Sequence, residues 1–279
     1  MAFTTESLGL PDGALALLRD LIHERTGLFY ENGKGDLLAD KLSPLVVERG
    51  FNSLLDYYYL LKYDAEADDE WRRVMDALSV QETYFGREVD QVRALVDVIV
   101  PQYFSTVRQT PLRIWSAACA TGEEPLSIAM ALDEKGWFER APIEIYASDA
   151  SEAAVKRARR GVYRERSFRS LAPQLRERYF SKVADGWRIT PELHSRIRWS
   201  VANLMVESDV AWLATAPVIF CRNVFIYFSQ DSIRKTATLF AHLMPRPGYL
   251  FVGASESLLR LTTDFDFQEI SGAFVYVKT

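Results

Sequence analysis

The first quarter of the chain carries apolar residues at helical spacing. Four segments show the pattern, with apolar positions at Leu15, Leu17, Leu18, Leu21 and Ile22, then Leu37, Leu38, Leu42, Leu45, Val46 and Val47, then Leu54, Leu55, Tyr58, Leu61 and Tyr63, and finally Trp71, Val74, Met75 and Leu78. Gly27 and Gly50 are placed to end the first two helices, and Ser53 is placed to cap the third. No strand pattern competes, so residues 1–78 are predicted to form a small all-α domain.

The rest of the chain alternates short apolar strands with helices. We predict strands over 112–117, 143–149, 218–221 and 249–252, the end of another at 201–204, helices over 89–107, 123–136 and 151–160 and from Ser229 to about Met244, and a closing hairpin of 265–270 with 274–277. Strands that alternate with helices form a mostly parallel sheet, and an antiparallel hairpin fits its edge. The predicted fold class is therefore α/β, preceded by the all-α domain.

Residues 113–125 combine a strand, a turn of small residues and the start of a helix. Residues 117–122 carry almost no side-chain bulk, so a ligand can come close to the backbone there. Glu123, Glu124 and Pro125 follow, and both acids and proline favour a helix N-terminus. The combination is typical of the start of a nucleotide-binding α/β unit. An ordinary strand-to-helix connection is the alternative.

Polar residues gather where the predicted strands end. Gly122 follows the first strand, Asp149 ends the second, Asn203 ends another, and Arg222 with Asn223 close a fourth. In open α/β sheets, ligands bind beyond the carboxyl ends of the strands. An acid at the end of the second strand can accept both hydroxyls of a ribose, although a lone Asp there is more often a turn former. The four clusters together favour a nucleoside site.

Residues 79–88 join the helical part to the α/β part. Gln81 and Thr83 are hydrogen-bonding residues beside aromatic ones, and Arg87 is a fixed cation with a planar fork of donors. A segment that lies over a ligand pocket suits this composition. A plain interdomain linker is the alternative.

Composition and charge narrow the class of protein. The 279 residues are 48% hydrophobic and 25% charged, as in a soluble globular protein. The net charge of −5 argues against a dominant nucleic-acid surface. Cys119 and Cys221 are far apart and lack metal-ligand spacing, so we expect buried free thiols and no metal site. With no secretory signal or membrane-spanning segment in the pattern, we expect a cytoplasmic monomer.

Three motifs resemble those of the chemotaxis-receptor methyltransferases, the CheR family. They are Trp-Ser-Ala-Ala-Cys-Ala-Thr-Gly-Glu-Glu-Pro-Leu-Ser-Ile-Ala-Met at 115–130, Ile-Phe-Cys-Arg-Asn-Val-Phe-Ile-Tyr-Phe at 219–228 and Val-Gly-Ala-Ser-Glu-Ser-Leu at 252–258. The resemblance extends from about Leu15 to Val277. It implies transfer of a methyl group from S-adenosylmethionine (SAM) to glutamate side chains in the cytoplasmic helical domain of chemoreceptors, with S-adenosylhomocysteine (SAH) as the product.

The resemblance also implies a domain arrangement. The helical domain, residues 1–78, precedes a Rossmann-like class I methyltransferase domain over residues 79–279. A small β-subdomain is inserted into the latter at about residues 162–199. Some family members use this insertion to grip a peptide tether of the receptor through a glycine-rich loop. Here the corresponding loop, 181–187, is short and has one glycine, so we predict that no tether is used.

Site roles follow from the resemblance, residue by residue. The implied cofactor contacts are Gln81, Thr83 and Arg87 in the linker, Gly122 in the loop, Glu123 or Glu124 (with Glu123 favoured) for the amino group, Asp149 for the ribose, Asn203 and Leu204 on the adenine side, and Arg222 and Asn223 near the methionine part. Arg87 could also orient the acceptor carboxylate, and Tyr227 could line the acceptor pocket, so these two are the candidate catalytic residues. A core tyrosine is the alternative for Tyr227.

The sequence differs from the usual methyltransferase loop, and its linker departs from the family pattern at two positions. Ala118 and Ala120 stand where the usual methyltransferase loop has its first two glycines, with Gly122 in the third place. In the linker, Gln81 replaces an asparagine and Gly86 replaces the second of two phenylalanines, which we expect to remove an aromatic residue from the pocket wall. The linker departures keep two alternatives open. One is a non-catalytic regulatory or scaffold protein that binds SAM or SAH, and the other is a methyltransferase of a non-chemotaxis acceptor.

Overall fold

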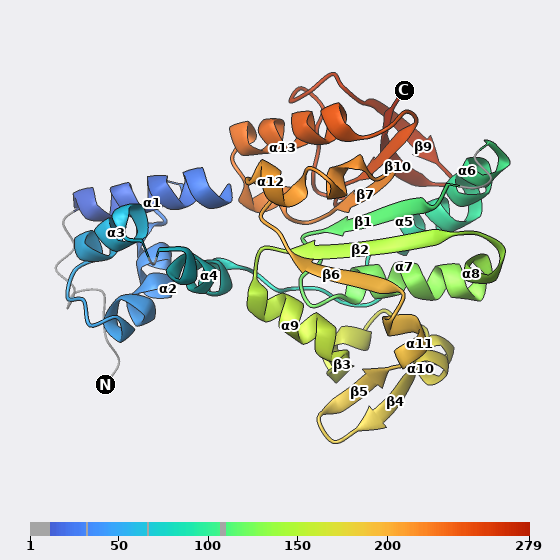
Figure 1. Ribbon diagram of the computed structural model, residues 1–279, viewed down its shortest axis with the longest axis horizontal. Helices are drawn as coiled ribbons and strands as arrows, with labels where there is room; N and C mark the ends of the chain where they lie inside the picture. The colour runs from blue at the N-terminus through green and yellow to red at the C-terminus, as the bar shows by residue number, and fades with distance from the viewer. Residues whose placement is uncertain (1–11, 32, 66, 107–109) are drawn as a thin grey trace.

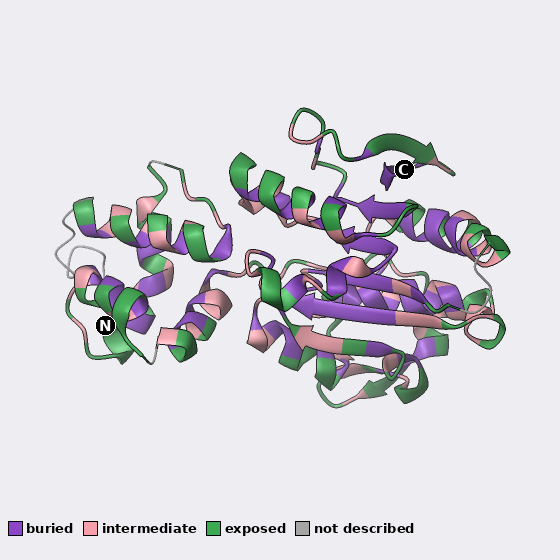
Figure 2. Cartoon of the chain, turned by 45° about the horizontal axis from the view of Figure 1, so that its top comes forward, coloured by how far each residue is buried: buried purple, intermediate pink, exposed green. Residues whose placement is uncertain are grey.

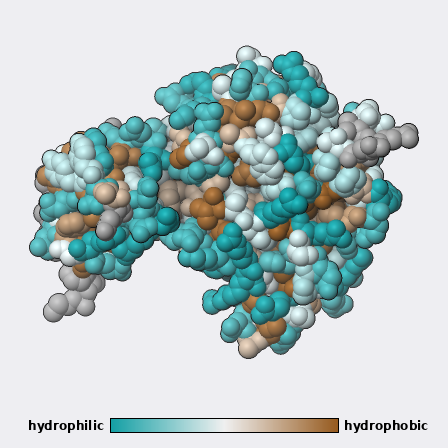
Figure 3. Space-filling model, in the orientation of Figure 1, coloured by the Kyte–Doolittle hydropathy of each residue, from teal (hydrophilic) through white to brown (hydrophobic). Residues whose placement is uncertain are grey.

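The computed structural model describes residues 12–31, 33–65, 67–106 and 110–279. A helical lobe (described residues up to 78) and a larger α/β body lie side by side, joined by the extended segment 79–88 (Figure 1). The two parts meet at a neck, and the face seen in Figure 3 is mostly hydrophilic with scattered hydrophobic patches. Within the described residues, no helix is both long and apolar enough to cross a bilayer.

The helical lobe is built from the four predicted helices. They are α1 (Asp12–Thr26), α2 (Gly35–Glu48), α3 (Leu54–Tyr63) and α4 (Ala67–Leu78). Ser53 caps α3 as predicted, because its side chain accepts hydrogen bonds from the backbone N–H groups of Leu55 and Asp56. The predicted apolar faces are too wide: Leu17 is 44% exposed and Leu37 is 51% exposed. Each lies about 100° around its helix from the next residue, which is buried.

Gly27 ends α1 in a left-handed conformation, with φ of +78°. A Cβ at this position would lie 2.9 Å from the Met205 sulfur and from the Phe228 ring, both in the α/β body. The end of α1 therefore approaches the body closely, and only glycine leaves room for that contact.

The α/β body is organised around a seven-stranded sheet, counted over the described residues, in the order β6-β2-β1-β7-β8-β10-β9. The bounds are β1 (Leu112–Ala117), β2 (Ile143–Asp149), β6 (Ile197–Val201), β7 (Val218–Cys221), β8 (Gly248–Phe251), β9 (Asp266–Ile270) and β10 (Ala273–Lys278). The strands from β6 to β8 pair in parallel, and β10 is antiparallel to both β8 and β9. The predicted mostly parallel sheet with an antiparallel edge hairpin is confirmed.

Helices cover both faces of this sheet (Figure 1). The helical segments are α5 (Val89–Ala94), the π-helix η2 (Leu95–Ile99), α6 (Val100–Thr106), α7 (Glu123–Glu134), α8 (Trp137–Arg140), α9 (Glu152–Arg160), α12 (Glu207–Val210), η4 (Leu213–Thr215), η5 (Phe225–Tyr227) and α13 (Gln230–Leu243). Alternate strand residues serve the two faces, as a period of two requires. Ile114 and Phe220 pack in the cluster that includes α7, whereas Trp115 and Ile219 pack in the cluster that includes α13. The central strands β1, β2, β7 and β8 are accordingly buried along much of their length (Figure 2).

One predicted helix is divided. The pattern predicts a continuous α-helix over 89–107, but a turn of π-helix at Leu95–Ile99 separates α5 from α6. Leu95 and Ile99 in this turn are fully buried, in the core cluster that includes residues of the sheet. The helix ends at Thr106 among the described residues, and position 107 lies outside them.

Between β2 and β6 the chain forms a small antiparallel sheet in the order β3-β5-β4. Its elements are β3 (Val162–Tyr163), η3 (Glu165–Phe168), α10 (Pro173–Tyr179), β4 (Phe180–Val183), β5 (Gly186–Ile189) and α11 (Pro191–His194). Phe85 of the linker is fully buried against Tyr163, Phe168 and Phe180, with ring centroids 4.9 to 5.2 Å apart. The linker is thus anchored in this small sheet. Strand β6 starts at Ile197, inside the range 162–199 predicted for the insertion, but belongs to the main sheet.

Candidate functional site

A cleft of about 670 Å³, open to solvent, lies at the carboxyl ends of β1, β2 and β7. The order of the sheet reverses between β1 and β7, which is where doubly wound sheets bind ligands. The residues that line the cleft are Thr26, Leu28, Met75, Ser79, Val80, Gln81, Ala118, Ala120, Asp149, Ala150, Ala202, Asn203, Leu204, Asn223, Val224, Tyr227 and Phe228.

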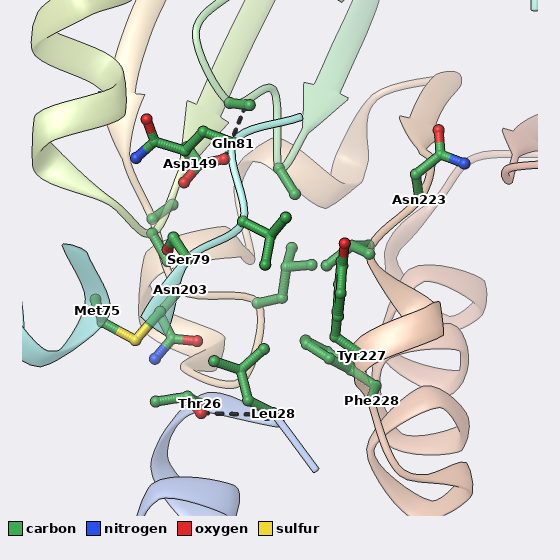
Figure 4. Close-up of a pocket in the computed structure, with 17 residues that line it drawn as sticks. Thr26, Leu28, Met75, Ser79, Gln81, Asp149, Asn203, Asn223, Tyr227 and Phe228 are labelled. Carbon is green, nitrogen blue, oxygen red and sulfur yellow. Dashed lines mark hydrogen bonds between the residues drawn. The ribbon is translucent and has the colours of Figure 1, made fainter. Parts of the chain in front are cut away.

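The structure brings half of the predicted site residues into this cleft. Gln81, Asp149, Asn203, Leu204, Asn223 and Tyr227 line it. Gln81 and Asp149 lie together beside the loop after β1, and Tyr227 faces the cleft from the opposite side (Figure 4). The other half, which does not line it, consists of Thr83, Arg87, Gly122, Glu123, Glu124 and Arg222.

The loop after β1 holds two alanines in the left-handed region. Ala118 has φ of +57° and Ala120 has φ of +49°, conformations that cost an L-residue about 1–2 kcal/mol relative to glycine. Hydrogen bonds hold the loop in place: the Ala120 N–H donates to Asp149 Oδ2 at 2.8 Å, and the Cys119 N–H donates to the Ser148 carbonyl at 2.9 Å. The alanines therefore keep the backbone path that glycines would take.

Gly122 has a packing role. A Cβ at this position would lie 2.7 Å from the ring of Trp199 and 3.1 Å from Ala158. Its φ of +96° is also in the left-handed range. Glycine is needed here because the start of α7 presses against α9 and β6.

Asp149 is held by the backbone at both carboxylate oxygens. Oδ2 accepts the Ala120 N–H, and Oδ1 accepts the Ser151 N–H, both at 2.8 Å. Burial raises the pKa of Asp149, and these two hydrogen bonds work against that rise. Each oxygen has a second lone pair, so the carboxylate can accept two further hydrogen bonds from a ligand.

Gln81 presents an unsatisfied acceptor. Its Nε2 donates to Ser151 Oγ at 3.1 Å, but its Oε1 is buried and has no hydrogen-bond partner. A buried carbonyl oxygen without a donor costs about 1–3 kcal/mol. Gln81 is among the residues that line the cleft, and a ligand donor that reached this oxygen would remove the cost. The glutamine in place of the family's asparagine thus stays in a position to contact a ligand.

Gly86, by contrast, does not line this cleft. It lies at a second cavity among α5, α7 and α10, together with residues such as Val92 and Leu171. Its φ is +75°, and a Cβ would lie 3.0 Å from the Ser170 carbonyl oxygen. The expected loss of an aromatic side chain from the wall of the ligand pocket is therefore wrong, since this backbone directs position 86 elsewhere.

The two acids at the start of α7 point into the protein. Glu123 is 2% exposed and accepts hydrogen bonds from Thr121 Oγ1 at 2.6 Å and Ser167 Oγ at 2.9 Å. Burial raises the pKa of Glu123. Glu124 accepts from Ser116 Oγ at 2.6 Å and from Arg222 Nε at 2.7 Å. Glu123 therefore secures the inserted subdomain, and Glu124 secures the end of β7.

The guanidinium of Arg222 uses its N–H donors in hydrogen bonds within the protein. Besides Glu124, its guanidinium donates to Gln91 Oε1 at 3.0 Å and to the Arg87 carbonyl at 2.9 Å. The side chain is 2% exposed. Arg87 itself lies in the linker, where its Nη1 donates to the Glu82 carbonyl at 3.0 Å. Arg222 thus ties the linker and α5 to the end of β7.

Glu256 is a site-supporting residue to which sequence reasoning assigned no role. Its carboxylate accepts the backbone N–H groups of Asn223 (2.8 Å), Gly253 (2.6 Å) and Ile226 (3.2 Å). Burial raises the pKa of Glu256. Asn223 is left-handed, with φ of +59°, so Glu256 holds the strained loop that leads to Tyr227. The sequence motif at 252–258 includes Glu256, but the motif alone does not reveal its hydrogen bonds to the loop.

The helical lobe supplies one wall of the cleft, which the sequence also did not indicate. Thr26, Leu28 and Met75 line it. Asn203 Nδ2 donates to the Arg25 carbonyl, and the Phe29 N–H donates to the Tyr227 carbonyl, both at 2.8 Å. The cleft is therefore shared between lobe and body.

Two family descriptions match the chain. "CheR methyltransferase, all-alpha domain" matches residues 13–79, and "CheR methyltransferase, SAM binding domain" matches residues 81–274. The boundary between the two matches falls at the start of the linker.

Known methyltransferases are similar over nearly the whole chain. Chemotaxis protein methyltransferase 2 of Vibrio cholerae is 33% identical over 275 residues, covering 96% of this chain and 94% of that protein. The chemotaxis protein methyltransferase of Escherichia coli K12 is 31% identical, covering 94% and 90%. A solved magnesium protoporphyrin IX methyltransferase from Synechocystis with bound SAM covers 78% of this chain and 91% of that one, but at 16% identity and a TM-score of 0.34 it adds nothing to the assignment.

The residues of the cleft fit SAM. The orphaned Oε1 of Gln81 needs a donor, and the ligand carries hydroxyl, ammonium and amino donors. Asp149 has free lone pairs for the ribose hydroxyls, and the small residues of the loop after β1 leave room for a nucleoside. On the matched domains, the similarity to these enzymes and the fit of the cleft, the chain is a SAM-dependent methyltransferase that belongs to the CheR methyltransferase family.

Proposed function

We propose that this methyltransferase modifies glutamate side chains in the cytoplasmic helical domain of chemoreceptors. One observation carries the proposal: Tyr227 lines the cleft that fits the cofactor, on the side opposite Asp149 and Gln81. The relatives' names, chemotaxis protein methyltransferase, supply the class of acceptor. The non-catalytic and non-chemotaxis alternatives are decided by the experiments below.

Within the cleft we assign the cofactor contacts to its own lining. Asp149 would accept the ribose hydroxyls, and Gln81 Oε1 would accept a further donor. Asn203 and Leu204 would lie at the adenine end, and Asn223 would lie toward the methionine part. Five further predicted contacts do not line the cleft and remain predictions: Thr83, Arg87, Gly122, Glu123 or Glu124, and Arg222.

Methylation of a carboxylate requires little acid–base catalysis from the protein. A glutamate with pKa near 4.3 is already ionised at neutral pH and needs no general base. When bound, SAM supplies a methyl group activated by its sulfonium sulfur. The chain's task is to exclude water and align the acceptor, and positioning of this kind can supply roughly 7–11 kcal/mol of barrier reduction. We propose that Tyr227 lines the acceptor side, with Arg87 able to orient a carboxylate from the linker.

A mostly apolar groove beside the cleft supports a helical, acidic acceptor. It shares Leu28, Val80 and Tyr227 with the cleft and adds Phe29, Tyr30, Leu37, Lys41 and Leu78. Phe29, Leu37 and Val80 are each about half exposed. The Lys41 ammonium lies among them, with its pKa lowered by burial. An amphipathic helix with glutamates could cover the apolar side chains and bring a carboxylate toward Tyr227.

We propose further that the enzyme acts as a cytoplasmic monomer without a peptide tether. Cys119 and Cys221 are free and buried, as suits a reducing compartment. Between β4 and β5, only Ala184 and Asp185 separate the two strands. This tight turn leaves no extended loop to enclose a peptide.

The acceptor is tested by methyl transfer from radiolabelled SAM to receptor cytoplasmic domains. We expect the label to be released as methanol on mild alkaline treatment, because a glutamate methyl ester is base-labile and an N-methyl group is not. Receptor variants with the glutamates changed to alanine are the control and should take up no label. If SAH binds but no receptor is labelled, the acceptor lies outside chemotaxis or the protein does not turn over.

Asp149→Ala should weaken SAH affinity at least about tenfold, because it removes the carboxylate that both shapes the loop and faces the cleft. Isothermal titration calorimetry measures the change. Asp185→Ala, in the exposed hairpin turn, is the matched control and should bind normally. Unchanged affinity in Asp149→Ala would undermine the assignment of the cleft.

Arg222→Ala should lower the free energy of unfolding by about 3–5 kcal/mol, since it leaves Glu124 buried without its partner. Denaturant unfolding measures this, and Arg234→Ala, which breaks an exposed pair with Asp231, should cost less than about 1 kcal/mol. Normal stability combined with lost SAH affinity would instead make Arg222 a direct cofactor contact.

Titration with a receptor C-terminal pentapeptide tests the absence of a tether. We expect no measurable binding, because the hairpin presents no loop that could enclose the peptide. Affinity in the micromolar range would contradict the proposal.

A further inference from the structure

We propose that Asp76, in helix α4 of the helical lobe, is a positioning residue for the cofactor cleft that acts on Asp149 and Gln81 through Ser151. Asp76 is not among the residues that line the cleft. The inference rests on the proposed contact of Asp149 with the ribose, and it adds a residue of the lobe to the machinery of that site.

The contacts run in an unbroken chain between lobe and body. Ser151 Oγ donates to Asp76 Oδ1 at 2.6 Å, and the Ala153 N–H donates to the same oxygen at 3.0 Å. Ser151 is fully buried, and its own N–H donates to Asp149 Oδ1 at 2.8 Å. Asp76 therefore holds the residue that holds Asp149.

The same contact sets the orientation of Gln81. A serine hydroxyl has one hydrogen to donate and two lone pairs to accept with. The hydrogen of Ser151 goes to Asp76, and the lone pairs accept the Ala154 N–H and Gln81 Nε2, both at 3.1 Å. Because Ser151 acts as an acceptor toward Gln81, the amide turns its NH2 group to Ser151 and leaves Oε1 as the free acceptor.

Asp76 also complements the start of α9. Its carboxylate lies at the N-terminus of this nine-residue helix, where the backbone N–H groups are unsatisfied and a negative charge is favourable. Ser151 is the N-cap of α9 and Asp76 accepts the Ala153 N–H that Ser151 does not reach. The lobe thus completes the cap of a helix in the body.

Asp76 is one of several contacts that hold the two parts together. Lobe and body are joined by other contacts that do not involve Asp76: His23 Nε2 lies 2.8 Å from Ser229 Oγ, and Asn203 Nδ2 donates to the Arg25 carbonyl. Removal of Asp76 should therefore leave the lobe docked while it loosens Ser151. We therefore expect the loss of Asp76 to lower cofactor affinity and to leave folding largely unchanged.

Calorimetric titration with SAH distinguishes the two roles. We expect Asp76→Ala and Ser151→Ala each to weaken SAH affinity about tenfold, with the double variant little worse than either, because both break one chain. Asp76→Asn keeps an acceptor oxygen and should restore most of the affinity. Asp69→Ala, an exposed acid of α4 paired with Arg72, is the matched control and should bind as the parent does. In methyl transfer, the KM for SAM should rise while the KM for the acceptor stays constant.

Two outcomes would overturn parts of this account, and they are separable. If Asp149→Ala weakens SAH binding but Asp76→Ala and Ser151→Ala do not, Asp76 is only an interdomain contact and the inference fails while the site stands. If Asp149→Ala also binds SAH normally, the proposed cleft assignment fails. Thermal unfolding of each variant identifies any loss of folding, and Ser151→Ala carries the test should Asp76→Ala not fold.

Discussion

The buried pair of Arg222 and Glu124 is the contact on which the geometry of the site depends. Two opposite charges removed from water are tolerated only if their remaining donors and acceptors are satisfied. Here the guanidinium reaches Glu124 at the start of α7, Gln91 in α5 and the main chain of the linker, while Glu124 also accepts from Ser116 at the end of β1. One ion pair therefore fixes two adjacent strand ends, two helix starts and the linker relative to one another. The cleft is formed by what these elements carry.

Strain in the site is localised and is offset by hydrogen bonds to buried carboxylates. Ala120 is left-handed and donates to Asp149, and Asn223 is left-handed and donates to Glu256. In both cases a carboxylate whose pKa is raised by burial collects backbone N–H groups from a loop at a strand end. Desolvation of the acid and strain of the loop are each unfavourable, and the charge-assisted hydrogen bonds between them compensate both. This explains how alanines can stand in a loop where glycines would be free of strain.

Much of the body could be predicted from the sequence, because the signal of a buried parallel strand is strong. The residues of β1, β2 and β7 are short apolar runs bounded by polar or small residues, and their predicted limits match the structure. The π-turn at Leu95–Ile99 was not predictable, because a helix with one wider turn keeps the same apolar composition. The sequence favoured Glu123 over Glu124 as the cofactor contact but could not show the internal partners of either acid, since only the packed neighbours decide where adjacent helix residues, about 100° apart in direction, find their hydrogen bonds.

The contribution of the helical lobe to the cleft was not predicted, for a different reason. Thr26, Leu28 and Met75 lie in or beside helices whose apolar pattern describes the lobe's own core, and no periodicity marks a residue that faces another domain. The consequence is thermodynamic as well as geometric. A ligand that needs the walls of both parts binds only the docked arrangement, so it stabilises docking by RT ln(1 + [L]/Kd), or about 2.7 kcal/mol at a hundredfold excess over Kd. If the groove beside Tyr227 receives the acceptor as we propose, cofactor binding and acceptor recognition are linked through the position of the lobe.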